Sequence, residues 1–397
     1  MRRWGWLLLL ANAGCGALTT EAPDDGDLFD APLPGLSPAE RAAFARGDED
    51  FGRGFSVNSG LGPVFNDVSC AACHSGDGRG ALSNILTRFS LNGDPVPELG
   101  GPQLQERAIP GAVAERLPSG VQVSRRLPPP VFGVGLIEAI PDSAILAQAD
   151  PDDANRDWIS GRPNWVEPPA WVPATEPGAG PGLRLGRFSR KAQVTTLVQQ
   201  TAEAYHQDIG ITTDFLPVEN VNPQARAASL AADRVSDPEL PASTVMSVVN
   251  YLRMLAAPAP GPDTPARQRG RSLFESTGCA SCHRPSYRTG FSPIAALSGQ
   301  AVTLYSDLLL HDMGDELADG RPDGQATGRE WRTAPLWGLR LVRGFLNGQA
   351  FLLHDGRART IEDAIGYHGG EGAAARAAFR ALSAEDRSAL LDFVGSR

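Results

Sequence analysis

Lysine is almost absent from this chain, and the overall charge has the wrong sign for binding nucleic acid. Lys191 is the only lysine among 36 basic residues, so arginine supplies nearly all of the positive charge. Acidic residues number 46, which gives a formal net charge of −10. Proteins that bind nucleic acid carry a basic surface instead. We therefore expect no nucleic-acid partner.

The apolar run from Trp4 to Ala11 is too short to span a bilayer. Two arginines precede it and small residues lead from it to Cys15, which is the arrangement of an export signal. We expect residues 1–15 to be that signal and Cys15 to be lipidated, with plain cleavage as the alternative. The protein would then be periplasmic and anchored to the outer membrane through its N-terminal lipid alone. Residues 16–36, rich in Asp and Pro, would form a disordered tether.

Cysteine is rare too, and four of the five cysteines lie in two copies of one pentapeptide. The copies are Cys70-Ala71-Ala72-Cys73-His74 and Cys279-Ala280-Ser281-Cys282-His283. C-x-x-C-H is the attachment site of a c-type haem, in which the thiols bind the porphyrin vinyl groups and the histidine binds iron. A thioredoxin-like redox pair or half of a zinc site is the alternative, but neither favours His after the second Cys. With 6 histidines in 397 residues, two coincidences have a probability of about 2 in 10,000. The sequence therefore predicts two covalently bound haem c groups.

Each haem motif lies in the same local setting. A helix begins before each motif, at Ser37-Pro38 in the first half and at Thr264-Pro265 in the second. An amphipathic helix closes each half, at 243–255 and at 383–394. We expect an all-α protein of two cytochrome c-like domains, residues 37–257 and 258–397, joined in a Pro-rich linker. The first domain contains a large loop-rich insertion.

One segment of this insertion resembles a calcium-binding loop. Asp153, Asn155 and Asp157 are spaced like the oxygen ligands of such a loop. Trp158 stands where the loop needs Gly, and no Glu closes it. A solvated acidic turn is therefore the alternative to a Ca²⁺ site.

Several further motifs identify a resemblance that covers nearly the whole chain from Phe44 onward. The chain resembles the di-haem oxidoreductase family, which is related to the bacterial di-haem cytochrome c peroxidases and to the di-haem enzyme of methylamine utilisation. The motifs are Gly60-Leu61-Gly62-Pro63-Val64-Phe65-Asn66, Phe132-Gly133-Val134-Gly135-Leu136-Ile137-Glu138, Ile159-Ser160-Gly161-Arg162-Pro163, Gln199-Gln200-Thr201-Ala202, His311-Asp312-Met313-Gly314, Trp331-Arg332-Thr333-Ala334-Pro335 and His354-Asp355-Gly356-Arg357-Ala358.

The resemblance implies a division of labour between the two haems. In the relatives the C-terminal haem has six ligands and passes electrons, whereas the N-terminal haem can open a site for peroxide. His368 falls where the relatives carry the sixth ligand of the C-terminal haem, so both axial ligands there would be histidine, His283 and His368. Tyr367 is a neighbour that could substitute. Arg332 and Arg357 are the expected partners of haem propionates.

The N-terminal haem is expected to have an open side. From Ser75 to Tyr205 the sequence contains no His and no Met that could block the iron opposite His74. In the relatives a Glu after a Pro-rich segment moves the proton between the peroxide oxygens, and Glu138 matches that place. The alternative is that Glu138 is merely exposed at a helix end.

The sequence thus predicts an enzyme in which electrons enter at the C-terminal haem and reduce peroxide at the N-terminal haem. The expected partners are hydrogen peroxide or a similar oxidant and an exported electron donor, either a small cytochrome or a cupredoxin. One alternative is an electron-transfer cytochrome with no catalytic iron. Another is an oxidase that acts on a protein or small-molecule substrate through high-valent haem.

Overall fold

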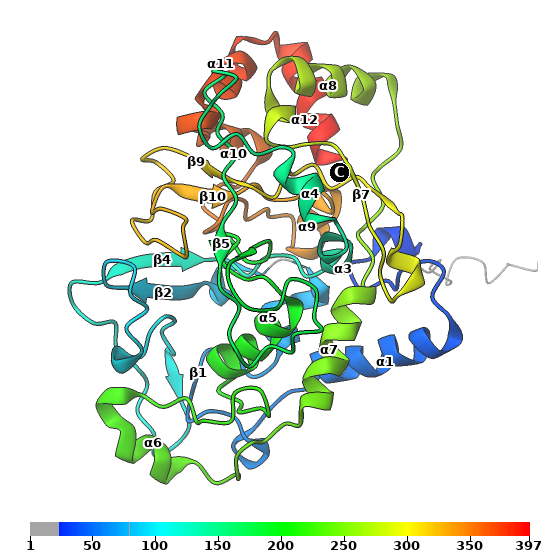
Figure 1. Cartoon of the computed structure of the whole chain (residues 1–397). Coiled ribbons are helices and arrows are strands. Elements are labelled where there is room, and N and C mark those ends of the chain that lie inside the picture. Colours follow the sequence, from blue (N-terminus) through cyan, green and yellow to red (C-terminus); the bar gives the residue numbers. More distant parts are fainter. Residues whose placement is uncertain (1–23, 79) are drawn as a thin grey trace, which may run out of the picture.

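Each half of the molecule contains a pair of crossed helices (Figure 1). The computed structural model describes residues 24–78 and 80–397. Helix α1 (Pro38–Gly52) packs against α7 (Ala242–Met254), and α8 (Pro265–Ser276) packs against α12 (Ala384–Gly395). The export signal and the lipidation site Cys15 lie outside the described residues. Within the described part of the chain, no helix combines the length and the apolar character that crossing a membrane requires.

A glycine lies at each helix crossing. A Cβ on Gly47 of α1 would lie 2.5 Å from the Ser247 carbonyl oxygen of α7. A Cβ on Gly270 of α8 would lie 2.1 Å from the Ala389 carbonyl oxygen of α12. Both distances are shorter than van der Waals contact, so each pair can approach this closely only because the crossing residue has no side chain.

The starts of these helices follow from local sequence. The Ser37 side chain accepts a hydrogen bond from the Glu40 amide, and the Glu40 carboxylate accepts one from the Ser37 amide at 2.7 Å. This capping box satisfies amide groups that the first turn leaves free. Thr264 caps α8 in the same way through the Arg267 amide. Pro follows the cap residue in both helices.

The all-α class predicted from the sequence is confirmed only in part. Helices predominate, but the described residues also form five two-stranded antiparallel sheets. The pairs are β1 (Val64–Phe65) with β3 (Arg107–Ala108), β2 (Leu86–Ser90) with β4 (Gln122–Arg126), β5 (Trp165–Val166) with β6 (Arg184–Leu185), β7 (Tyr287–Arg288) with β8 (Ala301–Val302), and β9 (Leu310–Asp312) with β10 (Glu330–Arg332). These short pairs hold the long loops of a helical framework together.

The remaining α-helices are shorter than those of the crossed pairs. In the first half they are α2 (Cys70–Cys73), α3 (Val134–Glu138), α4 (Asp142–Leu146), α5 (Leu197–Ala204) and α6 (Arg226–Ala232), and in the second half α9 (Leu339–Phe345), α10 (Ile361–Gly366) and α11 (Ala373–Ala381). A π-helical turn, Tyr205–Ile209, continues α5. Both α3 and α5 pack against α7.

The largest cluster of buried apolar side chains contains residues from both halves of the chain. Phe132, Val198 and Val249 of the first half share it with Leu309 and Trp337 of the second. Because burial of apolar surface is the main favourable term in folding, this shared core holds the halves against one another. The domain boundary at 257/258 stays a prediction.

Part of the predicted tether is packed rather than disordered. Phe29 is 1% exposed and stacks on Phe132 with ring centres 4.9 Å apart. The Leu33 amide donates to the Met254 carbonyl, and the Ala256 amide donates to the Ala31 carbonyl. The prediction for residues 16–36 is therefore wrong from Phe29 onward, because the apolar side chains of this stretch find partners at the end of α7.

Candidate haem sites

The first C-x-x-C-H motif forms a single helical turn, α2. The Ser69 side chain caps this turn by accepting a hydrogen bond from the Ala72 amide at 3.1 Å. The His74 amide donates to the Cys70 carbonyl at 2.9 Å and ends the turn. Cys70, Cys73 and His74 all face one cavity. The predicted attachment residues are therefore brought together on the wall of a single hollow.

This cavity is mostly apolar and has a volume of about 200 Å³. Its apolar walls come from α1, α5 and α7 of the first half, from the segment around Pro129, and from Trp337 of the second half. A flat apolar macrocycle would bury its rings against such walls.

Arginines from both halves of the chain line the same cavity, and some of their nitrogen atoms lack partners. Arg88 Nε, Arg126 Nη1 and Arg332 Nη1 are buried without a hydrogen bond. Burial also lowers the pKa of Arg332 to about 10. Unsatisfied guanidinium donors beside a C-x-x-C-H motif suit the two carboxylates of a haem. The residues present therefore fit a haem at this site.

His74 has the chemistry of a metal ligand. Burial lowers its pKa to about 4, so the ring is neutral at physiological pH. Its Nδ1 is buried without a hydrogen-bond partner. Among the described residues that line the cavity, there is no second His and no Met. The cavity thus contains one imidazole and no competing side chain of the types that usually bind haem iron from the second side.

One carboxyl group lines the cavity. Asp208, on the π-helical turn, accepts a hydrogen bond from the Gln103 side chain. Its burial in the protein raises the pKa of Asp208 to about 6. A carboxyl group with this pKa can exchange protons near neutral pH.

Glu138 does not lie in this cavity. Its carboxylate accepts two hydrogen bonds from Arg253 of α7, from Nε at 2.6 Å and from Nη2 at 3.0 Å. It lines a separate hollow together with Arg187 and Phe291. Because α3 packs directly on α7, the end of α3 presents Glu138 to Arg253 and not to the space beside His74. The structure therefore does not place Glu138 where the sequence prediction needs it.

The second motif places His283 opposite His368. The ring centres of the two histidines are 6.4 Å apart. Two imidazoles that bind one metal from opposite sides, each through a bond of about 2 Å, have centres about 6 Å apart. The His283 Nδ1 donates to the Tyr305 carbonyl at 2.9 Å and the His368 Nδ1 donates to the Ala364 carbonyl at 2.8 Å. Since a carbonyl can only accept, Nδ1 carries the proton in both rings and Nε2 keeps the lone pair that binds metal.

Burial keeps both of these rings neutral. It lowers the pKa of His283 to about 4 and lowers the pKa of His368 as well. A neutral imidazole is the form that coordinates metal. Cys279 and Cys282 lie beside this pair, with the Cys282 sulfur 3.6 Å from His311 Nδ1. The second site therefore fits a haem with two histidine ligands.

A hydrogen-bonded triad beside Cys282 was not predicted from the sequence. His311 lies between Asp307, 2.8 Å from Nε2, and Glu371, 2.6 Å from Nδ1. Glu371 also accepts hydrogen bonds from the amide and the hydroxyl of Ser160. Although burial opposes ionisation, the contacts with His311 and Ser160 lower the pKa of Glu371 to about 2. Ser160 and His311 both belong to motifs quoted above, whereas Glu371, which contacts both of them, belongs to none of these motifs.

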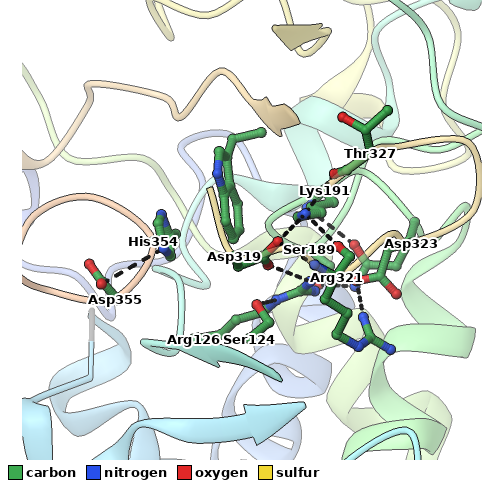
Figure 2. A network of polar contacts seen from close by, with 12 residues as sticks. Ser124, Arg126, Ser189, Lys191, Asp319, Arg321, Asp323, Thr327, His354 and Asp355 are labelled. Atoms are coloured by element: carbon green, nitrogen blue, oxygen red, sulfur yellow. Dashed lines mark hydrogen bonds and ion pairs between the residues drawn. The ribbon is translucent and has the colours of Figure 1, made fainter. Parts of the chain in front are cut away.

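A second polar network joins the halves near the first cavity (Figure 2). The Lys191 ammonium donates to the Asp319 carboxylate at 2.8 Å and to the carbonyls of Arg321 and Thr327. It lies 4.4 Å from the ring centre of Trp331, which stacks on His354 with ring centres 3.7 Å apart. The single lysine of the chain is thus fully buried among oxygen atoms.

Arg357 and the predicted calcium loop do not line the first cavity. Arg357 binds the Asp355 carboxylate at 2.7 Å and is not among the residues that line the described cavity. In the predicted loop, the Asn155 amide group donates to Asp157, and the Trp158 amide donates to Asp153. These oxygens already accept hydrogen bonds from within the turn. Ca²⁺ binding at this turn therefore stays a prediction.

Comparisons with known proteins point to one family. The family model described as "Di-haem oxidoreductase, putative peroxidase" matches residues 10–91 and 108–397. No curated protein matches the chain. Among solved structures, hydrazine synthase of Kuenenia stuttgartiensis is 14% identical, covers 100% of both chains and has a TM-score of 0.39. A MauG-like protein associated with microbial copper homeostasis is 15% identical over 65% of this chain and 88% of its own, with a TM-score of 0.30.

Proposed function

Since this chain belongs to the di-haem oxidoreductase family, we propose that it is a c-type di-haem enzyme that reduces peroxide. Electrons enter at the centre formed by His283 and His368 and are used in the cavity beside His74. The reaction consumes one peroxide, two electrons and two protons and yields two waters. The observation that carries this proposal is the contrast between the two centres. One has two imidazoles facing each other, and the other has one imidazole and an open cavity.

When bound beside His74, haem supplies an iron that can change its oxidation state and bind an oxygen of peroxide. The chain contributes the surroundings of that chemistry. Cys70 and Cys73 bind the vinyl groups as thioethers, and the neutral ring of His74 is the iron ligand. The unsatisfied guanidinium donors of Arg126 and Arg332 bind the propionates.

Asp208 is the residue that supplies a proton within the cavity. It takes the role that the sequence assigned to Glu138, because Asp208 lines the cavity whereas Glu138 is ion-paired to Arg253. Its pKa of about 6 allows it to give up a proton and regain one near neutral pH. Gln103, bound to the carboxylate, fixes the side-chain position.

The route of the electrons and the partners belong to the same proposal. The donor is an exported small cytochrome or cupredoxin that docks near α8, which ends just before the second motif, and near α12, which packs on α8. Trp337 is buried and lines the first cavity, so it is a candidate for the aromatic group between the centres. The chain itself is exported and lipidated at Cys15, which places it in the periplasm.

Electron paramagnetic resonance at low temperature of the haem-loaded, half-reduced protein tests this proposal. At that point the bis-histidine centre is reduced and silent, so the signal reports the centre at His74 alone. We expect a high-spin signal that peroxide changes. A low-spin signal that is indifferent to peroxide would refute an open site and would favour an electron carrier instead.

A further inference from the structure

Four carboxylates gather beside the end of α6, and this helix lies at the opposite end of the molecule from α8 and α11 (Figure 1). They are Glu219, Asp233, Asp237 and Glu239, called here the acidic cluster. Oxygen atoms of Glu219, Asp233 and Asp237 all lie within 4.8 Å of one another. The Thr212 hydroxyl links Glu239 to the other three carboxylates. It donates a hydrogen bond to Asp237 at 2.7 Å and also contacts Glu239.

Glu219 is the member that points to a bound cation. Its side chain belongs to a residue that is 8% exposed, and both carboxylate oxygens are buried without a hydrogen-bond partner. Glu239 Oε1 is also buried without a partner. Leaving such groups unpaired costs free energy, so native proteins satisfy nearly all of them.

Two other buried carboxylates, Asp319 and Asp323, are paired with cations, whereas Glu115 and Asp208 accept hydrogen bonds from Gln105 and Gln103. Asp319 binds Lys191, and Asp323 binds Arg126. In contrast, no Lys, Arg or His side chain of the described residues forms an ion pair with the acidic cluster within 4.0 Å. The site therefore contains negative charge, buried at Glu219 and exposed at Asp237, that no cationic side chain of the described residues compensates.

We propose that the acidic cluster binds one calcium ion through Glu219, Asp233, Asp237 and Glu239. All of the available ligand atoms are oxygen, and neither sulfur nor imidazole belongs to the cluster. Ca²⁺ accepts six to eight oxygens in irregular arrangements, whereas Mg²⁺ requires a near-ideal octahedron. Carboxylates contributed by two separate stretches, one at Glu219 and one at residues 233–239, suit the more tolerant ion.

The ion would hold the segment that forms one wall of the first cavity. Thr212, which binds the cluster, follows closely on Asp208 of the π-helical turn. The Asn66 amide donates to the Asp208 carbonyl at 2.7 Å, and the Gly62 amide donates to the Ile209 carbonyl. The segment 208–212 thus has Asp208 at the cavity and Thr212 at the acidic cluster. An ion at the cluster would therefore fix the end of this segment that lies away from the cavity.

Thermal unfolding of the haem-loaded protein, with EGTA or with calcium chloride in excess, tests the proposal. We expect calcium to raise the Tm by about 3 °C or more, and isothermal titration to give one site per chain. Glu219→Gln should lose both effects. In EGTA this variant should be at least as stable as the native chain, because it removes a buried charge. Asp157→Asn, in the turn first predicted to bind calcium, is the matched control and should keep both effects.

Several results would overturn the assignment. A native chain whose Tm and heat of titration do not respond to calcium has no such site. A Glu219→Gln variant that still binds calcium, or an Asp157→Asn variant that loses it, would move the ion elsewhere. A response to magnesium equal to that for calcium would refute the choice of metal. Asp237→Asn removes a second proposed ligand. Unchanged calcium binding by this variant would also contradict the proposed site.

Discussion

Replacing Glu371 by Gln tests whether the carboxylate between His311 and Ser160 holds the halves of the protein together. The change keeps the shape of the side chain, and its one carbonyl oxygen can still accept the hydrogen bond from the Ser160 hydroxyl. It removes the negative charge that faces His311, whose pKa is raised well above its usual value because Asp307 and Glu371 outweigh the effect of burial. An amide nitrogen replaces the oxygen that accepts from the Ser160 amide, so the variant removes one charge and one acceptor.

The magnitude follows from the pKa of the carboxyl group. Although burial opposes ionisation, the contact with His311 lowers this pKa from 4.5 to about 2. Such a difference between the unfolded and folded states corresponds to about 3 kcal/mol of stability at neutral pH. Because the folded pKa is depressed, the contribution is fully present above pH 4.5 and disappears as the pH falls toward 2. The difference between native and variant protein should shrink by about 1.4 kcal/mol per pH unit within that window.

Urea unfolding followed by circular dichroism measures this difference at pH 7, at pH 4.5 and at pH 3. Glu385→Gln is the control, since the Glu385 side chain is 81% exposed and lies 3.6 Å from Arg269. An exposed pair of this kind contributes less than about 1 kcal/mol. Equal stabilities of the native and Glu371→Gln proteins at pH 7 would refute the reasoning, as would a difference that does not depend on pH.

Two further predictions concern the haem centres. His368→Ala should convert the low-spin signal of the second centre to high spin, since it removes one of the two facing imidazoles; an unchanged spectrum would mean that another side chain is the ligand. Asp208→Asn should lower the rate of peroxide consumption by at least about tenfold, with peroxide binding intact in stopped-flow spectra. Glu138→Gln should leave that rate nearly unchanged. If Glu138→Gln lowered the rate more than Asp208→Asn, Glu138 would be the proton-transfer residue, as the sequence first suggested.

Local sequence was sufficient for several features of the fold. The capping box at Ser37 and Glu40 and the one at Thr360 and Asp363 form as their spacing predicts. The helix that was expected over 243–255 is observed as Ala242–Met254. Such features depend on residues three or four positions apart, so the sequence contains all of the necessary information.

Features that depend on distant parts of the chain were missed or misplaced. Glu138 stands in the expected motif, but its direction is set by Arg253, which lies 115 positions away. Arg88 and Arg332 come from different halves and meet only because the halves share a core. Phe29 lies in a stretch whose composition suggests disorder, and its burial depends on the position of Phe132. Composition and periodicity do not contain that information.

The burial of Lys191 also determines how the protein reacts with amine-directed reagents. It is the only lysine of the chain, and its ammonium is inaccessible to solvent. The folded protein therefore presents no lysine side chain for acylation, reductive methylation or amine cross-linking. Any modification of Lys191 reports that the contacts with Asp319 and the carbonyl groups around it have opened. The chain thus contains a single chemical probe for separation of its two halves, and the rate of labelling would measure how often that separation occurs.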